Sequence, residues 1–327
     1  MGVSLPNIVI VTTPTRMQGL VARWGTKGAA RFRLKQAIAH RAQRAETTDA
    51  VTLAEADFDL YETENTRYVQ TIEQLRDGLE EGFPVTILQR QYLANYDFRN
   101  AVVVIVVGPD GLVANTAKYV GDLPIVGVNP DPARNDGVLL PFRVEQVPRT
   151  VKAVLEQRAV TRSVTMAEAV LNDGQRLLAF NDFFVGRRSH VSARYNLRWR
   201  GKAEPQSSSG VLVATGAGST GWLSSVFNMM RGVTKWTGGK AGQPVQLEWQ
   251  DRRLAWVVRE PFASRHSSAA IVAGTVEEGE ELVVESLMPE SGVIFSDGIE
   301  EDFLEFNSGS TVRITVAGQH ANLVVRH

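Results

Sequence analysis

The run AVVVIVVGPDG at residues 101–111 decides the fold class of the first half of this 327-residue chain. Its seven consecutive apolar residues have the length of one strand, and a strand without polar alternation is typical of a parallel sheet covered on both faces. Ligands of open α/β sheets bind beyond the carboxyl ends of the strands. The Gly-Pro-Asp-Gly turn that follows this strand is therefore a candidate functional site.

Strand-like and helix-like segments alternate around this run. Short apolar stretches at residues 8–11, 85–88 and 125–128 have the length of further strands. One face of a helix is indicated by four apolar side chains at intervals of four, three and four residues: Tyr68, Ile72, Leu75 and Leu79. Asn65 could cap this helix and Gly82 could end it. The alternation predicts a parallel α/β layer.

The hydrophobic period changes to two after about residue 160. Over residues 193–199 apolar side chains alternate with polar or charged ones, which is typical of a half-buried antiparallel strand, and residues 312–316 repeat the pattern. The Asn-Asp-Gly at residues 172–174 indicates a hairpin. We therefore expect a parallel α/β domain over residues 1–149 and an antiparallel β-rich domain over residues 150–327, an α/β plus all-β fold class.

The composition excludes several classes of protein. Hydrophobic residues make up 43% and charged residues 22%, as in ordinary globular domains, and no stretch approaches the roughly 20 apolar residues of a membrane span. The chain has no cysteine and its five histidines are scattered, so no metal ligand is assigned. The amino terminus has no basic segment before its apolar run, and Pro6 stands where a myristoylation signal needs Ser or Thr. We expect a cytoplasmic protein without a membrane partner.

Positive charge is concentrated at the start of the chain. The first 45 residues contain eight Lys or Arg and no Asp or Glu, although the net charge of the whole chain is −1. This basic segment, residues 16–44, could attract polyphosphate or nucleic acid by long-range electrostatics. Only Trp24 and Phe32 are interleaved with it, and a solvated helix face is the commoner explanation. Nucleic acid is therefore not an expected partner.

Asp110 is the first candidate for chemistry, because it directly follows the buried strand. Its neighbours Gly108 and Gly111 would let a phosphate or a sugar approach the backbone closely. A β-turn without any ligand is the alternative, since Pro-Asp-Gly favours a turn by itself.

Asn181-Asp182 is the second candidate and follows the apolar residues 177–180. A carboxylate beside an amide can hold two vicinal ribose hydroxyls, because the acid accepts hydrogen bonds while the amide both donates and accepts. An Asx turn at the end of a strand is the alternative.

GAGSTG at residues 216–221 is the third candidate and has the spacing of a Rossmann glycine motif. It lies in the β-rich half, and no Asp or Glu occurs between Gly221 and Glu248 to bind a ribose, so a Rossmann site is not predicted. No lysine follows, which excludes a Walker loop. The N–H and hydroxyl donors of this turn could still hold a nucleotide, with a purely structural turn as the alternative.

Taken in order, these three turns resemble the motifs of the NAD kinase family. GPDGL at residues 108–112 resembles the GGDGT motif, Asn181-Asp182 resembles the Asn-Glu pair, and AGST at residues 217–220 resembles the TGST turn. Three longer stretches are similar to the branch represented by the mitochondrial enzyme: residues 126–137, 206–220 and 259–265. The resemblance extends over residues 61–306, most of the chain.

The resemblance implies an active site in the cleft between two domains and ATP- and Mg²⁺-dependent phosphorylation of the 2′-hydroxyl on the adenosine ribose of NAD. Asp110 would take the proton of that hydroxyl. Nucleotide-binding roles would fall on residues of the matching motifs and stretches: Gly108, Gly111, Asn129, Arg134, Asn181, Asp182, Ser209, Gly218, Ser219 and Thr220. The resemblance also implies a homodimer whose other partners are small nucleotides.

Four residues depart from the family pattern, and one of them is Trp222, which stands where many members have a smaller ring. Pro109 replaces the second glycine of GGDGT and removes a backbone N–H donor, while Leu112 replaces the threonine and its hydroxyl. Asp182 is one methylene shorter than the usual Glu. Two alternatives to an NAD kinase therefore stay open: a weak or inactive nucleotide-binding protein of the same fold, and a kinase for another small hydroxylated acceptor.

Overall fold

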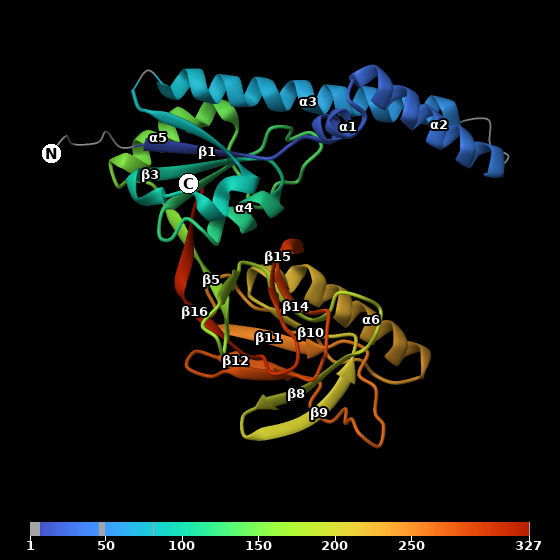
Figure 1. Cartoon of the computed structure of the whole chain (residues 1–327). Helices are drawn as coiled ribbons and strands as arrows, with labels where there is room; N and C mark the ends of the chain where they lie inside the picture. Colours follow the sequence, from blue (N-terminus) through green and yellow to red (C-terminus); the bar gives the residue numbers. More distant parts are fainter. Residues whose placement is uncertain (1–6, 46–49, 81, 327) are drawn as a thin grey trace. The chain divides into compact units, whose positions relative to one another are not determined.

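The computed structural model describes residues 7–45, 50–80 and 82–326, with side chains described for residues 7–36, 58–80 and 82–326 (Figure 1). The expectations that rest on residues 1–6 lie outside this range. The chain divides into two compact units. The first comprises Met1–Thr116, Leu123–Val160 and Val324–His327, and the second comprises Ala117–Asp122 and Thr161–Leu323.

A parallel sheet with the strand order β2-β1-β3-β4 forms the centre of the first unit. Residues 103–107 have no exposed surface, as the uninterrupted apolar run predicts for a sheet covered on both faces. Its strands are β1 (Asn7–Thr12), β2 (Val85–Gln89), β3 (Ala101–Val107) and β4 (Pro124–Val128).

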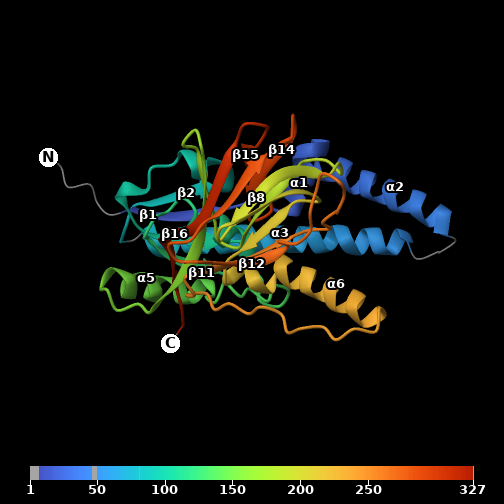
Figure 2. The ribbon, with the colours of Figure 1, turned by 90° about the horizontal axis from the view of Figure 1, so that it is seen from below.

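Helices α3 and α5 cover one face of this sheet. Tyr68, Leu75 and Leu79 of α3 share a buried cluster with Val147 and Val151 of α5 and with the strands. In Figures 1 and 2, α2 lies alongside the first half of α3. The helices of this part of the chain are α1 (Arg16–Trp24), α2 (Lys27–Ala45), α3 (Ala50–Glu80), α4 (Asp110–Ala117) and α5 (Val147–Leu155), with short 3₁₀ turns at Arg90–Asn95, Phe98–Asn100 and Val144–Gln146.

The described part of the basic segment lies on exposed faces of α1 and α2. Trp24 has the guanidinium of Arg23 at 5.0 Å and that of Arg33 at 5.4 Å from its ring centroid. Lys27 Nζ pairs with Glu62 at 2.8 Å. Aromatic rings and carboxylates of the same unit therefore engage much of this charge. The side chains of two further members, Arg41 and Arg44, lie outside the described residues.

Two sheets packed face to face form the second unit. One contains β16-β13-β8-β9, with β5 paired to β16 and β6 paired to β5, and the other has the order β12-β11-β10-β7-β14-β15. Tyr195 and Leu197 of the first sheet and Phe183, Val185 and Val213 of the second belong to the core that the two sheets share. The strands are β5 (Thr161–Leu171), β6 (Arg176–Ala179), β7 (Asp182–Arg187), β8 (Ala193–Trp199), β9 (Lys202–Ser208), β10 (Val211–Ala214), β11 (Arg253–Val258), β12 (Ala273–Glu277), β13 (Leu282–Ser286), β14 (Gly292–Ser296), β15 (Ile299–Glu305) and β16 (Thr311–Val324).

The outer face of the second sheet is covered by α6 (Trp222–Trp236). Leu223 and Val226 of this helix pack on Leu212, Ala214 and Val257 of the strands. A 3₁₀ turn, Ala217–Thr220, connects β10 to the helix. Because β10 and β11 on either side of α6 are antiparallel, this connection is not a Rossmann βαβ unit.

The architecture confirms the α/β plus β-rich fold class. The antiparallel pairing of β5 with β6 confirms the hairpin at residues 172–174, but α6 was not predicted. The expected start of the central helix at Asn65 is wrong, because α3 begins at Ala50. Asn65 is an interior residue of α3, and its Oδ1 accepts a hydrogen bond from the hydroxyl of Thr15, the N-cap of α1, at 2.7 Å.

Among the described residues, no helix combines the length and the apolar character that crossing a bilayer requires.

Candidate functional site

Asp110 is the first residue of α4, just beyond the end of β3. Its carboxylate accepts the backbone N–H of Leu139 at Oδ1 (2.9 Å) and that of Val138 at Oδ2 (3.2 Å). Gly108 permits the turn, because its φ of 155° is unfavourable for a residue with a Cβ, and an added Cβ would lie 3.0 Å from Leu112 Cδ2. Asp110 is thus a half-buried acid held in place by a neighbouring loop, with lone pairs left to accept further protons.

Pro109 and Leu112, the two residues of the GPDGL turn that differ from the GGDGT motif, have different surroundings. Pro109 is exposed, and its carbonyl accepts the N–H of Leu112 at 2.9 Å. The side chain of Leu112 is only 2% exposed and belongs to the interior. At residue 112 a buried apolar side chain therefore takes the place of the threonine hydroxyl of the GGDGT motif.

Gly111 gives a test of whether a ligand approaches this turn. It is exposed, its φ is not positive, and an added Cβ would have no atom within 4 Å. We expect Gly111→Ala to raise the free energy of unfolding by about 0.5–1 kcal/mol, because alanine is the better helix former and fits without strain. A phosphate that approaches this backbone would make the same substitution raise the KM for the phosphoryl donor severalfold. Urea unfolding and steady-state kinetics check both results, and a parental KM would contradict ligand contact at Gly111.

Asn129 and Arg134 lie in the loop that follows β4. The amide of Asn129 is used within the loop: Nδ2 donates to the carbonyl of Asn135 at 2.9 Å, and Oδ1 accepts the N–H of Asp131 at 3.1 Å. The buried Asp131 accepts a hydrogen bond from Arg67 Nη1 at 2.8 Å, and its other oxygen lies 3.8 Å from Arg134 Nε. Asn129 therefore stabilises the loop. Asp131 brings the guanidinium groups of Arg67 and Arg134 close together, where they could bind a phosphate.

In the second unit, the Asn181-Asp182 turn packs directly against the AGST turn. A Cβ added to Gly218 would lie 2.0 Å from the carbonyl oxygen of Asn181. Thr215 joins the two turns, since its N–H donates to the carbonyl of Asn181 at 2.9 Å and its hydroxyl donates to that of Phe180 at 2.6 Å. The structure therefore brings Asn181, Asp182 and Gly218 together.

The hydroxyl residues of the matching stretches differ in position. The hydroxyl of Ser219 donates to the carbonyl of Gly216 at 2.7 Å and so stabilises the turn, whereas Thr220 is exposed. Ser209 is exposed just before β10, and the AGST turn follows the other end of that strand. The structure does not bring Ser209 beside Asn181, because the length of β10, roughly 13 Å, separates them.

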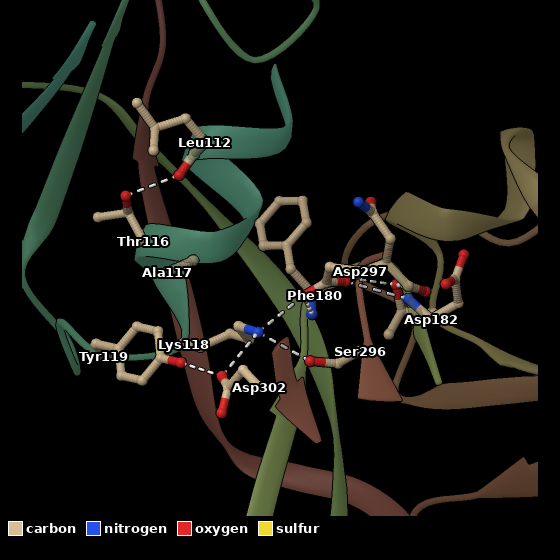
Figure 3. A network of polar contacts seen from close by, with 12 residues as sticks. Leu112, Thr116, Ala117, Lys118, Tyr119, Phe180, Asp182, Ser296, Asp297 and Asp302 are labelled. Carbon is tan, nitrogen blue, oxygen red and sulfur yellow. Dashed lines mark hydrogen bonds and ion pairs between the residues drawn. The ribbon is translucent and has the colours of Figure 1, made fainter. Parts of the chain in front are cut away.

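Asp297 fixes the backbone of the Asn181-Asp182 turn (Figure 3). Its carboxylate accepts the N–H groups of Asn181 at 2.6 Å, Phe180 at 3.1 Å and Asp182 at 3.3 Å. The carbonyl of Asp182 in turn accepts the N–H of Asp297 at 3.0 Å. The side chain of Asp297 is 1% exposed, so these N–H donors replace the water that the charge has lost.

Lys118 supplies a buried positive charge to the same network (Figure 3). Its Nζ donates to the hydroxyl of Ser296 at 2.9 Å and lies 4.0 Å from the carboxylate of Asp297 and 3.6 Å from that of Asp302. Asp302 also accepts a hydrogen bond from the hydroxyl of Tyr119. Since the Lys118 side chain is only 2% exposed, its charge is committed to the acids around it.

Two acids of this network have a raised pKa. Burial, with a smaller contribution from the nearby charge of Asp297, raises the pKa of Asp182 to about 7. Burial also raises the pKa of Asp297, although Lys118 and the three N–H donors oppose that change. At neutral pH the carboxyl of Asp182 is therefore divided between its two forms and can either donate or accept a hydrogen bond.

The raised pKa of Asp182 makes the stability of the protein depend on pH. The pKa is higher in the folded chain than in the unfolded chain, so the favourable contribution is complete below about pH 4 and is lost as the pH rises through about 7. We expect Asp182→Asn, which cannot ionise, to be more stable than the parent by a margin that grows by roughly 2–3 kcal/mol between pH 5 and pH 8.5. Urea unfolding at both pH values measures it. A margin independent of pH would contradict the assignment.

The sequence analysis missed Lys118, Asp297, Asp131 and Arg67. Asp297 carried a usable signal, since Ser-Asp-Gly at residues 296–298 follows an apolar strand as Pro-Asp-Gly does at Asp110. Lys118 carried none, because its hydrogen-bond partner Ser296 lies 178 residues further along the chain.

The described residues contain no group of three or more His, Cys, Asp or Glu side chains that could hold a metal ion. Mg²⁺ bound to nucleotide phosphates takes most of its ligands from the phosphates and water, with one or two carboxylates from the protein. A magnesium nucleotide therefore needs no dedicated protein cage.

Comparison with known proteins gives two informative matches, although no family model matches the sequence. A probable NADH kinase of Oryza sativa subsp. japonica is 24% identical over 235 aligned residues, covering 64% of this chain and 67% of that protein. The crystal structure of yeast NADH kinase complexed with NADH superposes with a TM-score of 0.52 and 14% identity, covering 99% of this chain and 84% of that chain. The resemblance to the NAD kinase family is confirmed. The closer likeness to the mitochondrial branch of the NAD kinases stays a prediction.

The NAD kinase likeness accounts for the fold, and the roles of individual residues rest on this chain's own geometry. Within the first unit that geometry fixes Asp110 at the end of β3. Within the second it joins the Asn181-Asp182 turn to the AGST turn.

Proposed function

We propose that this protein is an NAD(H) kinase, which transfers the γ-phosphoryl group of ATP to the 2′-hydroxyl on the adenosine ribose of NAD or NADH. The packing of the AGST turn on the Asn181-Asp182 turn carries the proposal. These motifs lie apart in the sequence, and together they present an amide and a carboxyl group, which can accept and donate hydrogen bonds to the hydroxyls of a ribose. The NADH kinase fold and the position of Asp110 support the same reaction.

In this reaction the ribose oxygen attacks the γ-phosphorus, an O–P bond forms, and the bond between the γ-phosphorus and the β,γ-bridging oxygen breaks. ADP leaves with the electron pair, and the hydroxyl proton passes to a carboxylate oxygen of Asp110. Mg²⁺ bound with ATP would supply neutralisation of the phosphate charge. The N–H groups of Val138 and Leu139 orient the Asp110 carboxylate, while its remaining lone pairs can accept the proton.

Asn181 and Asp182 would hold the ribose hydroxyls, and Gly218 would keep the AGST turn packed against the carbonyl of Asn181 beside the bound nucleotide. The three hydrogen bonds from this turn to Asp297 fix its backbone before the substrate arrives. Such preorganisation favours reaction, because less freedom is lost when the nucleotide binds. Arg134 and Arg67 are proposed phosphate partners, gathered by Asp131. We also propose that the enzyme works as a homodimer in the cytoplasm.

The test is direct conversion of NAD and, separately, NADH to the 2′-phosphorylated product. The purified 327-residue chain is incubated with each acceptor, Mg²⁺ and either ATP or polyphosphate, and the product is measured by chromatography. Formation of NADP or NADPH with at least one donor is expected. A protein that binds NAD or NADH but forms no product with either donor would contradict the proposal. That result would favour a nucleotide-binding protein of the same fold.

A further inference from the structure

One turn of α3 is hydrogen bonded to the chain at or just after the carboxyl ends of three strands of the parallel sheet. The hydroxyl of Tyr68 accepts the N–H of Thr13, after β1, at 2.9 Å and donates to the carbonyl of Val107, at the end of β3, at 2.8 Å. Arg67 Nη1 donates to Asp131, in the loop after β4, at 2.8 Å. All these groups belong to the first unit, and open α/β sheets bind ligands at this edge. Helix α3 therefore fixes the backbone around the Asp110 turn.

The Tyr68 side chain is buried and has its hydroxyl protonated. The residue is 7% exposed and shares a cluster with Leu75 of the same helix and with Ile10 and Val107 of the strands. Burial raises the pKa of Tyr68 to about 12. At neutral pH the hydroxyl can therefore donate one hydrogen bond and accept another, and the packed ring holds it in place.

The hydrogen bond to Val107 fixes the peptide unit from which the GPDGL turn starts. The carbonyl of Val107 and the N–H of Gly108 belong to one planar unit. The next backbone torsion is the φ of Gly108, 155°, which sets the direction of the chain toward Asp110. The segment after β1 packs against the same point, since a Cβ added to Gly108 would lie 3.4 Å from Thr13 Cγ2. A rotation of this peptide unit would move Asp110 away from the N–H groups of residues 138 and 139 that its carboxylate accepts.

We infer that Tyr68 is a positioning residue for the reaction, because its hydroxyl sets the orientation of the turn that carries Asp110. The inference rests on the proposed function for the role of Asp110. A general base must lie within hydrogen-bond reach of the proton that it takes, so a small rotation of the turn lowers the rate. Tyr68 acts through the backbone of β3 and needs no contact with the substrate.

Tyr68→Phe removes the hydroxyl and keeps the ring in its cluster. The kcat for formation of NADP or NADPH should fall by about tenfold, since a misplacement of about 1 Å can cost up to about 10² in rate. The KM for NAD should stay within about twofold of the parental value, because the proposed ribose contacts come from Asn181 and Asp182. Steady-state kinetics of the 327-residue chain measures both. A parental kcat in Tyr68→Phe would overturn the inference.

Ser286→Ala is the matched control, because it removes a buried hydroxyl with the same two kinds of hydrogen bond. Ser286 Oγ donates to the carbonyl of Phe306 at 2.7 Å and accepts the N–H of Met288 at 3.2 Å. Ser286 is 1% exposed and lies on β13 in the second unit, and neither partner belongs to the proposed site. Both variants should unfold at a temperature a few degrees below the parent, but only Tyr68→Phe should lose kcat. An equal loss of kcat in Ser286→Ala would overturn the inference.

Amide hydrogen exchange tests the geometry without turnover. The N–H of Leu112, which donates to the carbonyl of Pro109 at 2.9 Å, and the two N–H groups held by Asp110 report on the turn. In Tyr68→Phe they should exchange about tenfold faster than in the parent, as expected for the loss of one or two hydrogen bonds. Residues 103–106 of β3 should exchange at the parental rate, which checks that the fold is kept. Parental exchange throughout the turn would overturn the inference.

The two measurements let the two proposals fail separately. A protein without kinase activity whose turn exchanges faster in Tyr68→Phe would retain Tyr68 as the residue that orients the turn and would lose the proposed function. An active kinase whose Tyr68→Phe variant keeps the parental kcat and the parental exchange would do the reverse.

Discussion

Asp110→Asn should lower the kcat for formation of NADP or NADPH by about 10²–10⁴, the usual contribution of a general base. The amide cannot take the ribose proton, but its oxygen can still accept one of the two N–H groups that Asp110 binds from residues 138 and 139. The free energy of unfolding should therefore fall by only about 1 kcal/mol, as expected for one lost hydrogen bond. The KM for NAD should change little, because the proposed ribose contacts come from Asn181 and Asp182. Steady-state kinetics and urea unfolding measure the two effects.

Asp136→Asn provides the control for this substitution. Asp136 is an exposed acid in the loop that follows β4, so the same chemical change there should leave kcat and stability at parental values. An Asp110→Asn enzyme that keeps a kcat within about threefold of the parent would remove Asp110 from the role of general base.

Lys118→Met should destabilise the protein by about 3–5 kcal/mol, the usual consequence of leaving a buried charge without its partner. The substitution removes the cation 4.0 Å from the Asp297 carboxylate and leaves that acid 1% exposed. The pKa of Asp297 should rise further, and its protonated form accepts the three N–H groups of the Asn181-Asp182 turn less well. The affinity for NAD should therefore fall together with stability. Denaturant unfolding and calorimetric titration with NAD test both results.

The double variant Lys118→Met/Asp297→Asn shows whether the loss comes from the unpaired charge. With both charges gone it should be more stable than Lys118→Met alone, since the neutral amide can still accept hydrogen bonds from the turn. Lys152→Met on the exposed surface of α5 is the matched control and should stay within about 0.5 kcal/mol of the parent. Equal stability of Lys118→Met and Lys152→Met would contradict the buried network.

Most of the fold could be predicted from the sequence, because the period of the hydrophobic residues indicates the type of each element. The uninterrupted apolar run of β3 and the two-residue alternation of β8 each report directly on how many faces of the strand are covered. Helix α6 was missed although its sequence has a helical period. Leu223, Val226, Met230 and Val233 follow one another at intervals of three, four and three residues, and only the first two are buried. The apolar stripe of this helix therefore continues beyond the part that packs on the sheet.

The candidate site was predictable where polar residues follow a strand and unpredictable where they meet only through the fold. Asp110 and Asn181-Asp182 stood out because each interrupts an apolar stretch. The contact between Gly218 and Asn181 could not be predicted. In the sequence, a glycine that is needed because another backbone segment packs against it cannot be distinguished from a glycine that is needed for a turn. Lys118 lies at the end of an ordinary short helix, and its importance comes from burial beside acids near residue 300.

The hydrogen bond between Lys118 and Ser296 also has a consequence for how the chain folds during its synthesis. It closes a span of 178 residues, and a ribosome adding 5–20 residues per second needs roughly 10–35 s to make that span. Until then Asp297 and Asp302 have not been synthesised, and the ammonium group of Lys118 remains hydrated in the nascent chain. The Asn181-Asp182 turn therefore acquires its fixed backbone late, after most of its own sheet has been synthesised. In refolding the whole chain is present from the start, and this long-range contact should still form after the local secondary structure, so nucleotide binding should recover more slowly than helix and strand content.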